Sequence, residues 1–261
     1  MQNQAIINYI SEWMHIYAQN AKSKGFVIGI SGGIDSAVTS TLAARTGMSV
    51  LCIEMPIHQN KEQVNRAQEH IAWLKEKFPN VSSAKADLSG VFDHFVKTIT
   101  ETVEESENGM RSLVNTRARL RMTTLYYFAQ LYNYLVAGTG NKVEDFGIGF
   151  YTKYGDGGVD LSPIADLMKT EVFSLAKTLG IVRSILDAPP TDGLWNDNRS
   201  DEDQIGATYP ELEWAMYFEG KEESLTQRQQ KVLTIYKTFH RNNKHKMIPI
   251  PVCEIPKKFK H

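Results

Sequence analysis

The sequence predicts an α/β protein with a doubly wound parallel sheet and helices on both faces, built as a single domain over residues 1–261. Two observations predict this fold class. Short apolar runs alternate with helical segments at the spacing typical of strand–helix–strand units. The first of these runs also opens into a glycine turn that leads directly into a helix. A chain of this length can bury one substantial core.

Strands are expected where apolar runs are bounded by turn residues. These runs are 25–30, 48–55, 81–86 and a segment that begins at 134. Helices are expected at 6–21, 36–45, 60–77, 91–104, 110–133 and 167–179. The basic stretch from about 237, which three prolines punctuate, is expected to form a C-terminal tail.

The turn after the first strand reads Ser31-Gly32-Gly33-Ile34-Asp35-Ser36. Glycines let backbone N–H groups point inward, and the following helix N-terminus adds partial positive charge, so the turn predicts an anion site. It matches neither the loop of the common nucleoside triphosphatases nor the dinucleotide fingerprint. Asp35 would repel a phosphate unless a cation joins them, and Mg²⁺ is the expected cation. A plain connection between strand and helix is the alternative interpretation.

Further polar residues are expected on the same edge of the sheet. The fourth strand ends in Gly138-Thr139-Gly140, and Glu144 follows at a position where it could share a metal ion with Asp35. Lys169 falls in the first turn of a helix, where its charge opposes the helix dipole unless an anion lies nearby. An ordinary surface lysine is the alternative.

Residues 150–160 combine three glycines and two acids around Lys153. Such a segment predicts a shaped loop, and shaped loops at a ligand-binding edge are usually functional. Residues 191–200 are polar and rich in turn residues, and they are expected to form a lid over the site.

Composition argues against several classes of function. The formal net charge of −1 gives no global attraction for nucleic acid, and no apolar run is long enough to span a membrane. The two cysteines lie far apart in no metal-binding pattern, which favours a reducing, cytoplasmic location.

The loop at Ser31 resembles the pyrophosphate-binding loop of the ATP pyrophosphatase group, whose members cleave ATP between its α- and β-phosphates. Further blocks resemble NAD synthetase in the same order along the chain, namely 115–122, 138–144, 152–160, Lys169 and 201–209. The resemblance implies a homodimeric α/β enzyme that amidates nicotinic acid adenine dinucleotide (deamido-NAD) with ATP, Mg²⁺ and free ammonia. One departure from the family pattern is that residues 145–150 form a segment one residue longer.

The resemblance also implies roles for individual residues. ATP would contact Gly29, Ser31, Gly32, Gly33, Asp35, Ser36, Thr139, Lys169 and Thr191. Asp35 and Glu144 would hold Mg²⁺. Deamido-NAD would contact Arg119, Lys153, Asp160, His245 and Lys246. Asp156 is the candidate catalytic residue, positioned to orient ammonia.

Two other classes of function stay open on the sequence. One is a different adenylating enzyme of the same loop group, for example a GMP synthetase subunit or a tRNA-thiolation enzyme. The other is a nucleotide-binding regulatory or electron-transfer module without catalysis. Only one helix precedes the loop at Ser31, so we expect no glutamine-hydrolysing domain in this chain and expect it to use ammonia.

Overall fold

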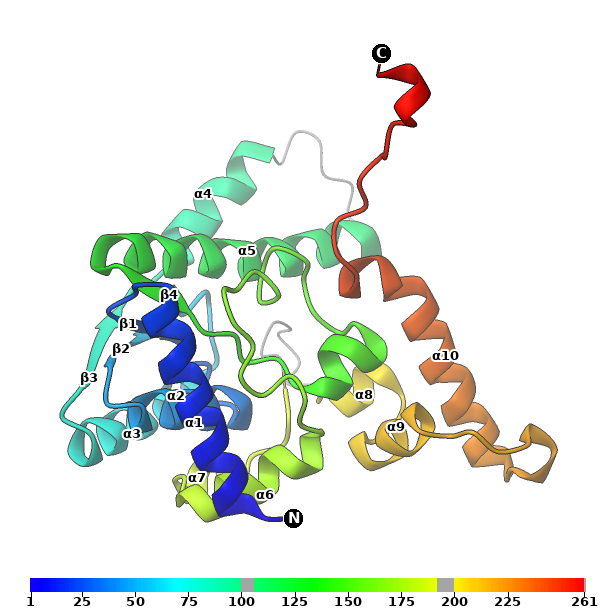
Figure 1. Ribbon diagram of the computed structural model, residues 1–261, viewed down its shortest axis with the longest axis horizontal. Coiled ribbons are helices and arrows are strands. Elements are labelled where there is room, and N and C mark those ends of the chain that lie inside the picture. Colours follow the sequence, from blue (N-terminus) through cyan, green and yellow to red (C-terminus); the bar gives the residue numbers. More distant parts are fainter. Residues whose placement is uncertain (100–105, 192–199, 261) are drawn as a thin grey trace.

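The computed structural model describes residues 1–99, 106–191 and 200–260. Its centre is a four-stranded parallel sheet in the order β3-β2-β1-β4. The strands are β1 (Gly25–Gly29), β2 (Ser49–Glu54), β3 (Val81–Lys85) and β4 (Tyr134–Val136). The chain moves outward from β1 to β3 and then returns to place β4 on the other side of β1 (Figure 1). This reversal makes the carboxyl ends of β1 and β4 the topological switch point, where doubly wound sheets bind ligands.

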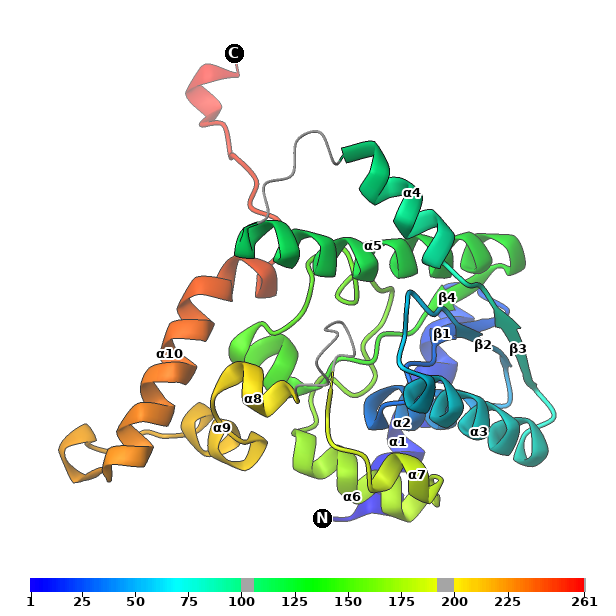
Figure 2. The same cartoon turned by 180° about the vertical axis from the view of Figure 1, so that it is seen from behind.

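Helices cover both faces of the sheet, which confirms the predicted fold class (Figures 1 and 2). The helices are α1 (Asn3–Asn20), α2 (Ile34–Arg45), α3 (Lys61–Lys77), α4 (Ser89–Ile99), α5 (Glu107–Tyr132), α6 (Lys169–Leu179), α7 (Arg183–Leu186), α8 (Asp201–Ile205), α9 (Tyr209–Met216) and α10 (Gln227–Met247). Shorter turns form η2 (Val143–Ile148), η3 (Glu222–Ser224) and η4 (Lys257–Phe259).

Successive side chains of β1 point to opposite faces of the sheet, so they pack into two separate cores. Phe26 and Ile28 pack with α1, α2 and α6 on one face, whereas Val27 packs with α5 on the other. Both faces of β1 are therefore buried, as expected for a short apolar strand in a parallel sheet. A third core joins η2, α9 and α10 beside the sheet.

Two segments differ from the sequence prediction. Residues 237–247 are not a tail but the second half of α10, and extended chain begins only at Ile248. Residues 143–148 form the π-helix η2, whose turn holds one residue more than an α-helical turn.

Other predictions fall partly beyond the described residues. The expected lid at 191–200 lies outside them except for its two ends, and the helix expected at 91–104 is described only as far as Ile99. Within the described residues, no helix has both the length and the apolar character needed to cross a membrane.

Candidate active site

The loop between β1 and α2 holds a compact set of hydrogen bonds. The Ser31 backbone N–H donates to Ser36 Oγ at 3.3 Å, and the Gly33 N–H donates to Ser31 Oγ at 3.1 Å. The Ser36 hydroxyl donates to the Gly33 carbonyl at 2.9 Å. Both serine side chains thus fix the curvature of the loop at the N-terminus of α2, where an anion is favoured.

Glycine is required at the centre of this loop. Gly32 has a φ of +82°, and a Cβ atom there would lie 2.4 Å from the Gln63 carbonyl oxygen of α3. Any larger residue would push the loop away from α3. The close approach explains the glycine at position 32.

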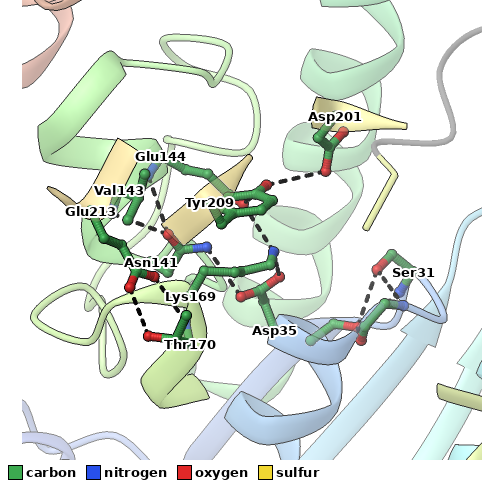
Figure 3. A network of polar contacts seen from close by, with 12 residues as sticks. Ser31, Asp35, Asn141, Val143, Glu144, Lys169, Thr170, Asp201, Tyr209 and Glu213 are labelled. Atoms are coloured by element: carbon green, nitrogen blue, oxygen red, sulfur yellow. Dashed lines mark hydrogen bonds and ion pairs between the residues drawn. The ribbon is translucent and has the colours of Figure 1, made fainter. Parts of the chain in front are cut away.

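A buried lysine joins two carboxylates beside the loop (Figure 3). Lys169 Nζ lies 2.6 Å from Asp35 Oδ2 and 2.9 Å from Glu144 Oε1. Lys169 is the first residue of α6, and it is only 3% exposed. The structure therefore brings together Asp35, Glu144 and Lys169 from α2, η2 and α6, and it excludes the alternative of a surface lysine.

Two residues that sequence reasoning did not assign complete this cluster. The Asn141 side chain donates to Asp35 Oδ1 at 3.2 Å and accepts the backbone N–H groups of Val143 and Glu144 at the start of η2. The Tyr209 hydroxyl lies 2.6 Å from Glu144 Oε1, and its ring lies under Lys169 Nζ. Asn141 directly follows the Gly138-Thr139-Gly140 turn, and this position before a helical turn is the sequence signal that could have identified it.

The N-terminus of α6 is itself held in place. Glu213 of α9 accepts the Thr170 backbone N–H at 2.9 Å and the Thr170 hydroxyl at 2.7 Å (Figure 3). The Glu171 side chain accepts the Met168 N–H at 2.8 Å. These bonds satisfy helix-terminal donors and fix the position from which Lys169 extends.

The electrostatics of the cluster follow from burial and from this ion pairing. Burial raises the pKa of Asp35 despite the neighbouring Lys169. Burial also disfavours the charge on Lys169, but the carboxylates of Asp35 and Glu144 outweigh it and raise the pKa of the ammonium. Glu144 keeps a pKa below its usual value, because Lys169 and the Tyr209 hydroxyl outweigh its burial.

Two more acids face the same space. Burial, with the charges of Glu144 and Asp156 added, raises the pKa of Asp145 to about 8. Asp156 accepts the Thr152 backbone N–H at 2.9 Å, and loss of solvation in the pocket raises the pKa of its carboxyl group. The pocket thus holds more carboxylates than cations on the side of Lys169.

Repulsion between these neighbouring acids contributes to the raised pKa values of Asp145 and Asp156, and a divalent cation would offset that repulsion. Asp35 and Glu144 converge on one point from two elements, and Mg²⁺ is commonly held by one or two carboxylates together with phosphate oxygens. Across the described residues, no group of three or more His, Cys, Asp or Glu side chains forms a metal site without further ligands. The donor set is therefore suited to a metal ion that arrives with a phosphate.

The cluster opens into a pocket of about 280 Å³ at the switch point of the sheet. Every residue predicted to contact ATP lines this pocket, namely Gly29, Ser31, Gly32, Gly33, Asp35, Ser36, Thr139, Lys169 and Thr191. Glu144 and Asp156 line it as well. The pocket continues past Met55 and Leu125 along the end of β2, where its wall is more apolar.

The residues predicted to contact deamido-NAD do not line this pocket, although several of them adjoin residues that do. Successive hydrogen bonds link Arg119, Lys153 and His245 at the end of α10. The second of these bonds runs from Lys153 Nζ to the His245 carbonyl at 2.9 Å. Lys246 Nζ donates to the carbonyls of Gly149 and Tyr151 at 2.6 and 2.8 Å. The Asp160 carboxylate accepts the Val136 N–H at 2.8 Å and the Tyr126 hydroxyl at 3.1 Å. In this structure Lys246 and Asp160 therefore hold the 149–160 segment against α10 and β4.

Comparison with known proteins places this site in a family. The family model for NAD synthase matches residues 6–249. An NH(3)-dependent NAD(+) synthetase from Syntrophomonas wolfei is 39% identical over 215 residues, covering 82% of this chain and 84% of its relative. One from Alkaliphilus oremlandii is 36% identical over 253 residues, covering 94% and 96%. Among solved structures, NMN synthetase from Francisella tularensis superposes with a TM-score of 0.85 at 31% identity, covering 98% of this chain and 99% of that one. The chain therefore belongs to the NAD synthase family.

Proposed function

We propose that this chain amidates deamido-NAD with ammonia at the expense of ATP, and releases NAD, AMP and pyrophosphate. The enzyme is a ligase that forms a carbon–nitrogen bond. The observation that carries the proposal is the cluster of Asp35, Lys169 and Glu144 beside the Ser31 loop in one pocket. The matched relatives named NH(3)-dependent NAD(+) synthetase support the same conclusion.

The chemistry explains why such a pocket is needed. A carboxylate is a poor acceptor for ammonia, because its leaving group would be oxide. Transfer of AMP to the nicotinate carboxylate supplies a better leaving group, but it requires two anions to approach each other. The backbone N–H groups of the loop and the Lys169 ammonium offset this repulsion, with pyrophosphate leaving into the loop at Ser31.

We propose that Asp35 and Glu144 hold Mg²⁺ during this reaction. There the metal ion would offset the repulsion between the carboxylates and the phosphates of ATP. Lys169 bridges the two carboxylates at 2.6 and 2.9 Å. It therefore keeps the two carboxylates close to each other.

Ammonia then attacks the carbonyl carbon of the acyl-adenylate and displaces AMP. We keep Asp156 as the group that orients ammonia, since its carboxylate lines the pocket and has a raised pKa. A carboxyl group with a raised pKa is a better proton acceptor for an ammonium group than an ordinary exposed aspartate.

We also propose a cytoplasmic homodimer that takes only small-molecule substrates. Both cysteines are free thiols, which is typical of a reducing compartment. Tyr127 and Leu131 lie four residues apart on α5 and are 63% and 56% exposed, so they form an apolar face that a second subunit could cover.

The function is tested by supplying ATP, deamido-NAD and ammonium and measuring AMP and NAD together. Equal amounts of the two products support amidation through an adenylate. Xanthosine monophosphate and tRNA serve as competing acceptors, because they are the substrates of other enzymes with a similar loop. Release of pyrophosphate with one of these acceptors, and none with deamido-NAD, would contradict the proposal.

A second candidate is amidation of nicotinic acid mononucleotide. The NMN synthetase from Francisella tularensis is named for the product of that reaction, and it covers nearly the whole chain at a TM-score of 0.85. Both substrates carry the same nicotinate carboxylate, so the chemistry at Asp35, Glu144 and Lys169 would be identical. The ratio of kcat/KM for the two substrates decides between them.

A further inference from the structure

One carboxylate oxygen in the pocket wall has nothing to bind. Glu54 is the last residue of β2, and its side chain lines the pocket. Its Oε2 atom is buried, and among the described residues no donor lies within hydrogen-bonding distance of it. Because removing a carboxylate oxygen from water without a partner costs free energy, such a group is unfavourable in the free protein.

The position of Glu54 indicates which ligand could supply the missing donor. Gly29 at the end of β1 pairs with Ile53 of β2, so Glu54 lies one strand away from the loop at Ser31. Neighbouring strands are about 4.8 Å apart. The pocket that contains the loop extends to Glu54, Met55 and Pro56 at the end of β2, so a nucleoside whose phosphates lie in the loop has room over this strand. Ribose, which is attached directly to the α-phosphate, is the part of the nucleoside nearest to the loop.

The phosphates of ATP, its adenine ring and a metal ion are less suitable partners for the Glu54 carboxylate. The phosphates carry negative charge and would be repelled by Glu54. Met55 and Leu125 offer apolar surface beside Glu54, which suits the face of the adenine ring, while Arg121 at the same wall donates to the Met55 carbonyl at 3.0 Å and to Gln59 Oε1 at 2.8 Å. A metal role lacks support, since no three acidic, histidine or cysteine side chains of the described chain converge on a common site.

We infer that Glu54 accepts a hydrogen bond from a ribose hydroxyl of ATP and so makes the pocket selective for ribonucleotides. This inference rests on the proposed use of ATP by the pocket. It adds a specificity residue, because a site built to pair a hydroxyl rejects the analogue that lacks it when its own buried acceptor is left unsatisfied. In the complex, this hydrogen bond offsets the free energy that the unpaired oxygen costs in the free protein.

The test compares ATP with 2′-deoxy-ATP, 3′-deoxy-ATP and the purine analogue that lacks the 6-amino group. Binding by calorimetry and kcat/KM for AMP formation are measured for the natural chain, Glu54→Leu and Glu54→Gln. Glu62→Gln is the matched control, since Glu62 is exposed on α3 and does not line the pocket. Calorimetry reports nucleotide binding even if the acceptor substrate has been wrongly assigned, so failure of the proposed function can be told from failure of this inference.

The natural chain should prefer ATP over one deoxy analogue by about tenfold to a hundredfold, the range of a hydrogen bond to a charged group. Glu54→Leu should lose this preference, and Glu54→Gln, which keeps a carbonyl acceptor, should retain part of it. Glu54→Leu should melt no lower than the natural chain, because the variant removes an unpaired buried oxygen. A preference unchanged in Glu54→Leu and Glu54→Gln would overturn the inference. The inference would also be overturned if the Glu54 variants lost only the preference for ATP over the analogue that lacks the 6-amino group. That result would assign Glu54 to the adenine base.

Discussion

The hydroxyl of Tyr209 lies 2.6 Å from Oε1 of Glu144. The same hydroxyl is 3.3 Å from Oδ2 of Asp201, at the start of α8. A phenol has one proton to donate, and the shorter contact identifies Glu144 as its better acceptor. Tyr209 is also the first residue of α9 and is only 3% exposed. It therefore fixes the direction of the Glu144 carboxylate from a rigid, buried position.

Tyr209→Phe should weaken the site without unfolding the protein. The variant removes one hydrogen bond to a carboxylate, so kcat/KM should fall by about tenfold to a hundredfold. The Mg²⁺ concentration at half-maximal rate should rise, because Glu144 becomes free to turn away. Tyr217→Phe is the control, since Tyr217 is 62% exposed at the end of the same helix. An unchanged Mg²⁺ dependence in Tyr209→Phe would show that Glu144 needs no support from Tyr209.

Asp35→Asn should abolish turnover while the fold stays intact. An amide is a poor ligand for Mg²⁺, and the substitution also removes the shorter of the two ion pairs of Lys169. Circular dichroism would verify the fold, and AMP formation would be followed across a Mg²⁺ titration. Activity equal to that of the natural chain at limiting Mg²⁺ would rule out the metal assignment.

The glycine turn at Ser31 and the convergence of Asp35, Glu144 and Lys169 were predictable because they depend on local signals and on sheet topology. A glycine turn between strand and helix is readable from neighbouring residues, and parallel strands carry such turns to one edge. Glu144, Asp35 and Lys169 then meet although up to 134 positions separate them in the sequence.

Tyr209 and Glu54 were not assigned, and the reason is physical. The Tyr209 hydroxyl reaches Glu144 across 65 positions because α9 packs on η2 in a separate core, and no local pattern encodes that packing. Whether the Glu54 oxygen is buried and unpaired depends on how the elements around β2 pack, which the local sequence does not encode. By contrast, the error at residues 237–247 was avoidable. Thr226 and Gln229 form a capping box that starts α10, and no proline interrupts the helix before Pro249.

The protein should lose stability as the pH falls because of His70. This side chain of α3 is fully buried against Trp73, with Nε2 3.0 Å from Ser40 Oγ, and burial lowers its pKa to about 4. In the unfolded chain its pKa is about 6.5. The unfolded state therefore binds the proton at a higher pH than the folded state does. The stability that neutral His70 contributes is complete above about pH 6.5 and is lost as the pH falls toward 4.

The expected loss from His70 alone is roughly 3 kcal/mol over that range. Melting temperatures of the natural chain and of His70→Gln are compared between pH 4 and 8. Because carboxylates titrate in both proteins, the difference between the two curves isolates the loss that is due to His70. The two curves should converge as the pH falls. Parallel curves would mean that the pKa of His70 is the same in the folded and unfolded protein.

The chain should sediment as a dimer through the apolar face of α5. Leu131→Glu places a charge among Tyr127, Leu131 and Tyr132, which are 63%, 56% and 46% exposed, so this variant should sediment as a monomer. Gln227→Glu adds the same charge at the exposed start of α10, on a different helix, and should stay dimeric. A natural chain that is monomeric and fully active would exclude the interface.

The last prediction concerns the nitrogen donor, which we expect to be free ammonia. Release of ammonia from glutamine needs an activated nucleophile such as a cysteine thiolate. Cys52 lies on β2 in the core, where burial raises its pKa to about 12 and keeps the thiol protonated. Cys253 is exposed in the extended segment after α10. Cys253→Ser should therefore leave the rate with ammonium unchanged.

Because NH₃ and not NH₄⁺ has the electron pair that attacks the acyl-adenylate, the rate at subsaturating ammonium should rise with pH until a group of the enzyme titrates. The measurement compares glutamine with ammonium salts, using protein freed of contaminating glutaminase. Efficient use of glutamine by the pure chain, abolished in Cys253→Ser, would contradict the prediction. Use of glutamine only after a second protein is added would instead identify a separate glutaminase that delivers ammonia to this pocket.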